Sequence, residues 1–270
     1  MTGLGNTAPI GVFDSGIGGL TVARAIRSVL PNERFIYFGD TAHLPYGDKS
    51  PELVASYAKG IAHFLLEKHS CKAIVIACNT ASAAAYESLR DTYRGHLPVI
   101  NVIDPMIEEV IAAEGLQKVG VIATKTTVAS GVYQEKFNRR KPDLTVATLA
   151  TPLLASIIEE GFYDNSISEA IIHRYLSDSC LQGIQALILA CTHYPLIKNQ
   201  ISEYFSGKVR IFDSAAVVAS KLKIILEKEN LLSTNIQNDD RFYVSDYTPA
   251  FELATKTFFG HTIRLERCVL

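Results

Sequence analysis

The stretch Ala73 to Cys78 reads AIVIAC, and the stretch Ala186 to Cys191 reads ALILAC. Each is a short apolar run that ends in a cysteine and is followed by polar residues, which is typical of a parallel strand buried on both faces. Open α/β sheets bind their ligands at the carboxyl ends of such strands. The two runs therefore predict an α/β fold with thiols at two equivalent strand ends. They raise the question of whether both thiols face one small molecule.

Other elements recur in the same order along the chain. KVGVIATK (118–125) resembles PIGVFDS (9–15), and a strand VRIFD ending at Asp213 resembles a strand VINVID ending at Asp104. Self-similarity at a nearly constant separation indicates two copies of one structural unit. We therefore expect two similar parallel-sheet α/β domains related by internal pseudo-symmetry, with the active site in the cleft between them.

The same pattern predicts where one domain ends and the next begins. The strands at 99–104 and 209–213 close one unit and feed the next. The first domain would then be discontinuous and consist of residues 1–98 together with 210–270. Residues 99–209 would form the second domain.

Composition excludes several classes of protein. The chain has 270 residues, 48% of them apolar, and a formal net charge of −2, so it can bury a large core and carries no basic footprint for nucleic acid. No apolar run approaches the roughly 20 residues that cross a bilayer, and the N-terminus lacks the basic and apolar regions of a signal peptide. We expect a cytoplasmic protein with a small-molecule ligand and neither a membrane nor a nucleic-acid partner.

The cysteines support this location. Their number is odd and their positions are scattered, which favours free thiols in a reducing compartment over a disulfide framework. They are Cys71, Cys78, Cys180, Cys191 and Cys268.

The first predicted strand ends at Asp14 and Ser15 and runs into a turn with Gly16, Gly18 and Gly19. The spacing is not that of a dinucleotide-binding loop, and no P-loop lysine and serine follow. The simpler interpretation is that the glycines permit a tight turn and that Asp14 caps the following helix. A second strand, RFIYFGD (34–40), leads into a loop rich in hydroxyl and turn residues that could cover a pocket.

A thiol can act as a nucleophile, a metal ligand, a redox partner or a proton carrier. Cys191 with nearby His193 fits a nucleophile and its base, but this leaves Cys78 unexplained. The sequence has neither the paired spacing of a structural zinc site nor the C-x-x-C of a redox site. As proton carriers, one thiolate would remove a proton from a carbon and the opposite thiol would return one to its other face. We expect helix N-termini after both strands to lower the thiol pKa values as this requires.

A simpler explanation competes for each of these residues. Buried cysteines are common and usually behave as small, inert apolar groups. His193 could be a hydrogen-bonded core histidine, and Asp14 could be a helix cap. Packing alone does not explain why two similar strands each deliver a cysteine into a polar segment, Asn79 and Thr80 in one case and Thr192 and His193 in the other.

Four motifs carry a resemblance to a known family. GVFDSGIGGLTV (11–22), YFGDTAHLPYG (37–47), ACNTAS (77–82) and ACTHYPL (190–196) together resemble the glutamate racemases, which belong to the cofactor-independent aspartate/glutamate racemases. A weaker likeness reaches the C-terminus. The resemblance implies an isomerase that interconverts L- and D-glutamate without pyridoxal phosphate or metal, supplies D-glutamate for peptidoglycan, and works as a homodimer.

The resemblance also implies roles for individual residues. Cys78 and Cys191 would be the two proton carriers, with Cys191 acting on L-glutamate and Cys78 on D-glutamate. Asp14, His193 and Glu159 would assist them; in the segment TPLLASIIEEG (151–161), Glu159 fits this role better than its neighbour Glu160. The implied substrate contacts are Asp14, Ser15, Pro45, Tyr46, Gly47, Cys78, Asn79, Thr80, Thr124, Cys191, Thr192 and His193.

Two other functions share parts of this pattern. A two-domain periplasmic-type binding protein would have a similar cleft, but it has no use for paired thiols and needs a signal peptide. A racemase acting on aspartate or a hydantoin would share both cysteines and differ in pocket size.

Overall fold

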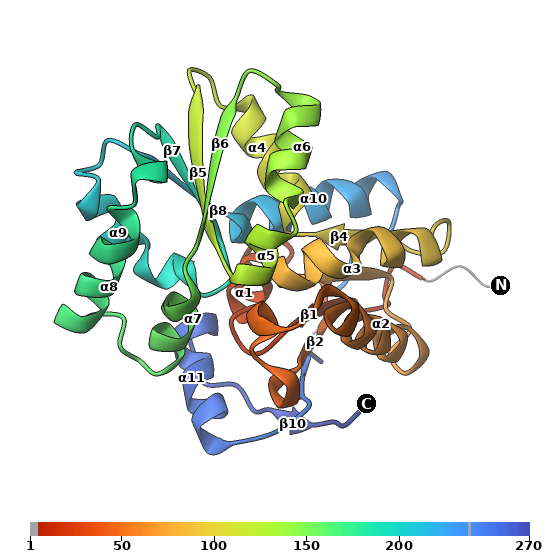
Figure 1. Cartoon of the computed structure of the whole chain (residues 1–270). Helices are drawn as coiled ribbons and strands as arrows, with labels where there is room; N and C mark the ends of the chain where they lie inside the picture. The colour runs from red at the N-terminus through yellow and green to blue at the C-terminus, as the bar shows by residue number, and fades with distance from the viewer. Residues whose placement is uncertain (1–4, 237–238) are drawn as a thin grey trace.

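The computed structural model describes residues 5–236 and 239–270. These residues form two parallel β-sheets with helices packed around them, as Figure 1 shows. The prediction of a parallel-sheet α/β fold with two sheets is confirmed.

The first sheet combines strands from both ends of the chain. Its central strands are wholly buried, which explains why their sequences are continuous apolar runs. All its strand pairs are parallel. In spatial order the strands are β10 (Glu266–Arg267), β9 (Arg241–Val244), β2 (Phe35–Gly39), β1 (Ile10–Asp14), β3 (Ala73–Ile76) and β4 (Val99–Asn101).

The second sheet is built from one continuous part of the chain. Its strands are also parallel, and β7, which carries the ALILA run, is completely buried. In spatial order they are β6 (Thr145–Ala150), β5 (Lys118–Ala123), β7 (Ala186–Ala190) and β8 (Arg210–Asp213).

The two sheets repeat one pattern. The order β2-β1-β3-β4 in the first corresponds to β6-β5-β7-β8 in the second. The registers agree as well, because Gly11 lies opposite Ile74 and its counterpart Gly120 lies opposite Leu187. This register makes Cys78 equivalent to Cys191, so the predicted internal repeat is present.

One part of the predicted repeat was wrong. The strand expected to end at Asp104 ends at Asn101, and helix α4 (Ile103–Ala112) contains Asp104 in its first turn. The side-chain oxygen of Asn101 accepts hydrogen bonds of 2.7 Å from the backbone N–H groups of Ile103 and Asp104, which turns the chain into the helix early. The pairing registers make Asn101, not Asp104, the counterpart of Asp213.

Sheet membership also differs from the predicted division of the chain. β4 pairs with β3 in the first sheet and β8 pairs with β7 in the second, whereas the division at residues 98 and 209 placed each strand in the other domain. The predicted boundaries lie just before β4 and β8. The chain instead adds each of these strands to the sheet it is already building and passes to the other unit afterwards. The exact domain limits stay a prediction.

Helices follow most strands and cover both sheets. Several begin with the expected capping residues: the Ser50 hydroxyl caps α2 by accepting from the N–H of Leu53 at 3.3 Å, with Pro51 at the first helical position. The α-helices are α1 (Leu20–Val29), α2 (Pro51–Glu67), α3 (Asn79–Thr92), α4 (Ile103–Ala112), α5 (Lys125–Ala129), α6 (Val132–Arg140), α7 (Pro152–Glu159), α8 (Ser166–Leu176), α9 (Lys198–Tyr204), α10 (Ser214–Lys228) and α11 (Pro249–Phe259).

A shared core joins the two units. α10 packs against both α1 and α4, and one buried apolar cluster includes Val12 of the first sheet, Val121 and Ile188 of the second, and Val218 of α10. A second cluster lies under α2 and α3 on the other face of the first sheet. Because the larger cluster is continuous, the two units bury part of their apolar surface against each other.

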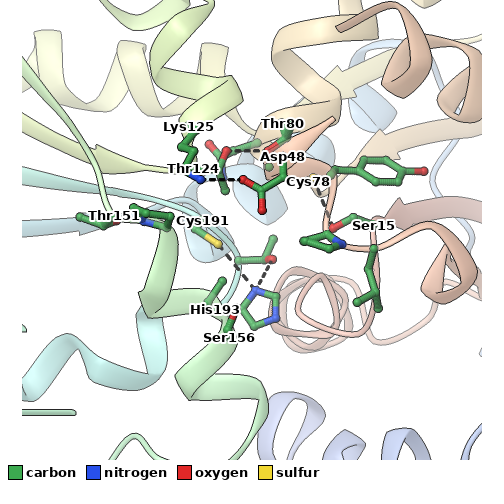
Figure 2. A pocket seen from close by; sticks show the side chains of 18 of the residues that line it. Ser15, Asp48, Cys78, Thr80, Thr124, Lys125, Thr151, Ser156, Cys191 and His193 are labelled. Carbon is green, nitrogen blue, oxygen red and sulfur yellow. Dashed lines mark hydrogen bonds and ion pairs between the residues drawn. The ribbon is translucent and has the colours of Figure 1, made fainter. Parts of the chain in front are cut away.

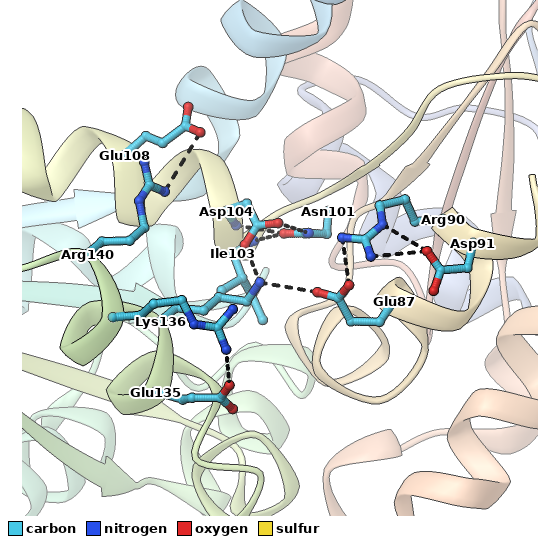
Figure 3. A network of polar contacts seen from close by, with 11 residues as sticks. Glu87, Arg90, Asp91, Asn101, Ile103, Asp104, Glu108, Glu135, Lys136 and Arg140 are labelled. Carbon is cyan, nitrogen blue, oxygen red and sulfur yellow. Dashed lines mark hydrogen bonds and ion pairs between the residues drawn. The ribbon is translucent and has the colours of Figure 1, made fainter. Parts of the chain in front are cut away.

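Ion pairs add a polar connection at the surface, shown in Figure 3. Lys136 of α6 lies 2.6 Å from Asp104 of α4 and 3.5 Å from Glu87 of α3. Glu108 of α4 pairs with Lys221 of α10 at 2.7 Å. These pairs are half-exposed, so they fix the relative position of the helices more than they stabilise the fold.

Candidate active site

The carboxyl ends of the two sheets enclose one cavity. Figure 2 shows Cys191 on one side of it and Cys78 and Ser15 on the other. The lining residues come from both units: Ser15, Leu44, Pro45, Tyr46, Gly47, Asp48, Cys78, Asn79, Thr80, Thr124, Lys125, Thr151, Pro152, Ala155, Ser156, Glu159, Ala190, Cys191, Thr192, His193 and Tyr194. The residues predicted from the sequence therefore meet here, with Asp14 directly behind the lining.

Asp14 ends β1 and is fully buried. Its Oδ2 atom accepts hydrogen bonds from the backbone N–H of Gly16 at 3.1 Å and of Gly19 at 3.0 Å, so the carboxylate does hold the turn that starts α1. Its Oδ1 atom has no partner among the described residues. Burial raises the pKa of Asp14, and the nearby His193 acts in the opposite direction.

Cys78 lies at the junction of β3 and α3, and its side chain is nearly buried. Its Sγ accepts a hydrogen bond from the backbone N–H of Ala81 at 3.4 Å and donates one to Ser15 Oγ at 3.7 Å. Burial, followed by the charge of Asp14, raises the pKa of the Cys78 thiol to about 12. The expected lowering by the helix N-terminus was wrong here, because desolvation outweighs the hydrogen bond to Ala81.

Cys191 has different neighbours. A 3₁₀ turn at Tyr194–Ile197 separates it from α9, so no α-helix begins directly behind this thiol as the sequence had suggested. Instead, the Cys191 Sγ lies 3.6 Å from Nδ1 of His193, and Nε2 of His193 lies 2.8 Å from Oε1 of Glu159. The arrangement is a thiol, imidazole and carboxylate in hydrogen-bonded sequence.

The imidazole of His193 is buried, which by itself lowers its pKa, but its hydrogen bonds to Cys191 and Glu159 outweigh burial and raise the pKa well above the usual value. Glu159 is the last residue of α7, and the next residue, Glu160, points into solvent. Of the two glutamates compared from the sequence, Glu159 is the one that reaches the site.

Close approach to His193 requires a glycine in the first unit. A Cβ atom on Gly18 would lie 2.4 Å from Cε1 of His193 and 2.5 Å from Oγ1 of Thr192. The Thr21 hydroxyl also donates a hydrogen bond to the Thr192 carbonyl at 3.2 Å. The glycine-rich turn therefore serves to bring the two units together around the imidazole.

Amide and hydroxyl groups from both units also line the cavity. Asn79 accepts a hydrogen bond from Tyr133 at 2.8 Å, while its Nδ2 group is buried without a partner in the described part of the chain. Thr80 Oγ1 lies 2.9 Å from Thr124 Oγ1 and 3.2 Å from Thr127 Oγ1, which joins α3 of the first unit to α5 of the second. Such groups can bind a carboxylate without an arginine.

The loop after β2 covers one side, as expected. Pro45, Tyr46 and Gly47 line the cavity, and the Tyr46 hydroxyl donates a hydrogen bond of 2.5 Å to Asp40. Thr126 donates a hydrogen bond of 2.8 Å to the carbonyl of Gly47, which attaches this loop to the second unit.

Sequence reasoning missed several lining residues, among them Thr151, Ser156, Lys125 and Asp48. Thr151 could have been found from the repeat, because it follows β6 as Asp40 follows β2. Because the sequence did not predict a strand at 145–150, the correspondence between Thr151 and Asp40 could not be drawn from it. Lys125 ends the repeated stretch KVGVIATK, and Asp48 directly follows the motif YFGDTAHLPYG, but neither stretch indicated that these side chains line the cavity.

Within residues 5–236 and 239–270, no group of three or more His, Cys, Asp or Glu side chains is arranged to hold a metal ion. No helix in the same part of the chain is long and apolar enough to span a bilayer.

Comparison with known proteins agrees with the repeat and the site. Residues 20–222 match the family model described as Asp/Glu/Hydantoin racemase. A glutamate racemase of Neisseria meningitidis serogroup A is 43% identical over 264 residues, covering 97% of each chain. The crystal structure of glutamate racemase from Francisella tularensis in complex with D-glutamate superposes with a TM-score of 0.91 at 39% identity, covering 97% of this chain and 98% of that one.

A second solved structure gives the same result. The glutamate racemase isoform RacE1 from Bacillus anthracis has a TM-score of 0.93 and 34% identity, with 98% of both chains covered. Two copies of one α/β unit that place paired thiols on one cavity, together with these matches along almost the whole length, establish that the chain belongs to the Asp/Glu/hydantoin racemase family.

Proposed function

We propose that this protein is a glutamate racemase that interconverts L- and D-glutamate by transferring a proton at the α-carbon between two thiols. The observation that carries the proposal is the pair of equivalent strand-end cysteines, Cys78 and Cys191, on one cavity. Proton removal on one face and return on the other inverts the carbon, and it needs one acid and one base at opposite sides.

The different surroundings of the thiols suit this division. For L-glutamate, Cys191 would remove the α-proton, with His193 beside its sulfur and Glu159 behind the imidazole. Cys78, whose pKa is raised to about 12 by burial, holds its proton at neutral pH and is therefore ready to donate it to the opposite face. For D-glutamate the roles reverse, and Cys78 must first give up its proton to a base, for which the unpartnered Oδ1 of the nearby Asp14 is available.

The amide and hydroxyl groups that line the cavity beside the thiols would bind the substrate. Asn79, Thr80 and Thr124 offer an amide and hydroxyls for a carboxylate, and the unpartnered Nδ2 of Asn79 is a buried donor that a carboxylate oxygen would satisfy. The unpartnered Oδ1 of Asp14 is a buried acceptor that could receive a proton from the substrate ammonium or from a neighbouring thiol.

The direct test is circular dichroism of the purified protein with L-glutamate, and then with D-glutamate, without added cofactor. Both signals should decay to zero, while L-aspartate, one methylene shorter, should keep its signal. Dialysis and a chelator should leave the rate unchanged. Activity that disappears on dialysis and returns with pyridoxal phosphate would contradict the two-thiol mechanism.

We propose further that the enzyme works in the cytoplasm as a homodimer and supplies D-glutamate for peptidoglycan. Free thiols at all five cysteines, each within the described residues, suit a reducing compartment. The exposed apolar side chains of Leu153, Phe162 and Ile167 offer surface for a second copy. Cell fractionation would test the location, and the mass of the protein in solution would test the homodimer. Growth of a strain that otherwise requires D-glutamate would test the supply of D-glutamate.

A further inference from the structure

The charged side chains around the cavity fall into two sets. Glu159 and His193 lie inside and contact each other at 2.8 Å. Asp48 of the first unit and Lys125 of the second lie at the rim, 3.2 Å apart, and are 57% and 60% exposed. Figure 2 marks the contact between Lys125 and Asp48 with a dashed line. Among the described lining residues, Lys125 is the one lysine or arginine.

The proposed substrate and several residues of this cavity carry negative charge. On the proposed function, on which this inference rests, the ligand carries two carboxylates and one ammonium group at neutral pH. The interior already holds Glu159 and, behind the lining, Asp14, and the imidazole of His193 is already in contact with Glu159 and Cys191. An anionic ligand that enters such a site is repelled unless a cation stands near its path.

The backbone at the rim is held independently of the ion pair. Thr124 caps α5 by accepting a hydrogen bond from the Thr127 N–H at 3.3 Å. The Thr126 hydroxyl donates to the carbonyl oxygens of Gly47 and Lys49 at 2.8 and 3.0 Å. Lys125 therefore keeps its place at the rim when its ammonium group leaves Asp48, and an exposed pair of this kind contributes little to stability.

We infer that Lys125 is a specificity-determining residue whose ammonium group draws a substrate carboxylate into the cavity, and that Asp48 holds this group between turnovers and competes with the substrate for it. The two side chains then have opposite effects on substrate binding. If the ion pair only held the two units together, removal of either side chain would break the same contact and would change KM in the same direction.

Four variants separate these cases: Lys125→Met, Lys125→Arg, Asp48→Asn, and Lys221→Met as the control. Lys221 also forms a half-exposed pair with an acid, Glu108, but away from this cavity. In Lys125→Met we expect KM for glutamate to rise by about tenfold with kcat nearly unchanged, and its dependence on ionic strength to weaken. In Asp48→Asn we expect KM to fall, by about two- to threefold. Lys125→Arg should keep most of the affinity, and Lys221→Met should change nothing.

The outcomes distinguish this inference from the function on which it rests. If both rim variants shift KM in the same direction, or if Lys125→Met behaves like Lys221→Met, the inference is wrong while the racemase remains. A wild-type protein that does not racemise glutamate removes the proposed function and this inference with it. Calorimetric titration of D-glutamate into each rim variant, made in Cys191→Ser protein that we expect not to racemise, gives the same comparison without turnover.

Discussion

The two strand ends that carry the thiols occupy equivalent positions in their sheets but have different surroundings. Cys78 passes directly into α3, has a hydroxyl and a backbone N–H as partners, and lies near a buried carboxyl group. Cys191 is followed by a 3₁₀ turn and has an imidazole backed by Glu159. The fold thus supplies two similar positions, and local residues decide how each thiol handles its proton.

This difference has a physical origin in the turn after each strand. An α-helix that starts directly after Cys78 orients backbone N–H groups toward the sulfur. The 3₁₀ turn after Cys191 leaves room for the side chain of His193 to fold back onto its own strand end, where Gly18 of the other unit allows it to fit. One thiol therefore depends on the backbone and the other on side chains.

Loss of either thiol should have the largest effect on the rate of racemisation, because it removes one of the two groups compared above. We expect Cys78→Ser and Cys191→Ser each to lower racemisation on the order of 10³-fold or more in both directions, because a turnover needs one thiolate and one thiol. Serine is a far weaker acid and base. The measurement is loss of optical signal from each enantiomer; a variant with either cysteine replaced that keeps full activity would require a one-base mechanism.

The same variants can show which thiol serves which face. Glutamate with a chlorine on its β-carbon loses chloride after deprotonation alone. Cys78→Ser, which keeps Cys191, should still eliminate from the L-analogue, and Cys191→Ser should eliminate from the D-analogue. The opposite pairing would exchange the two assignments, and elimination from both analogues by one variant would contradict the facial division.

Removing the carboxylate behind the imidazole should weaken one side selectively. In Glu159→Gln we expect elimination from the L-analogue to fall about 100-fold and elimination from the D-analogue to change much less, because His193 contacts Cys191. Glu160→Gln is the matched control, one residue further and exposed. The L/D ratio is the informative quantity, and equal losses with both analogues would mean that Glu159 only supports the fold.

A methyl group on Gly18 should disturb the same side from the other unit. Its Cβ would lie 2.4 Å from His193, so the imidazole must move, and we expect Gly18→Ala to lower activity about tenfold. Gly60→Ala is the control, because a Cβ there meets nothing within 4 Å. Steady-state kinetics and thermal unfolding of both variants separate a displaced imidazole from general destabilisation.

The raised pKa of Cys78 predicts the smallest effect, on stability at high pH. Burial raises this pKa from 9.0 to about 12, so the folded protein keeps a proton that the unfolded chain releases. The contribution is present below pH 9 and is lost as the pH rises toward 12. Between pH 8 and 10 the wild type should lose roughly 1 kcal/mol of unfolding free energy more than Cys78→Ser. Denaturant unfolding checks this, and parallel losses would contradict it.

Much of the fold could be predicted because the signals are local. The runs ending at Cys78 and Cys191 have the continuous apolar character of buried parallel strands, and their repetition indicated two units. β6 was not predicted because its residues are only half-buried and its alternation of apolar and polar residues is weak. The end of β4 was predicted wrongly because the Asn101 side chain accepts a hydrogen bond from the backbone N–H of Ile103 and so starts the helix. A pattern of apolar residues does not reveal such a hydrogen bond.

The site was predictable where it follows strand ends and unpredictable where it depends on contacts across the cavity. Residues such as Thr80 and His193 follow their strands directly. The rim pair of Asp48 and Lys125 joins segments from different units, so its existence depends on how those units pack. The pKa of Cys78 likewise follows from burial, which the helix position alone did not reveal.

The path of the chain also has a consequence for how the protein folds. The second sheet takes its strands from the continuous segment 118–213, whereas the first adds β9 beside β2 only after residue 241. We expect the second sheet to become protected first, while the edge of β2 stays open until the C-terminal segment returns, because closing that long loop is entropically costly. Pulsed hydrogen exchange during refolding should therefore show late protection of β2, and truncation before β9 should leave an unpaired edge that promotes aggregation.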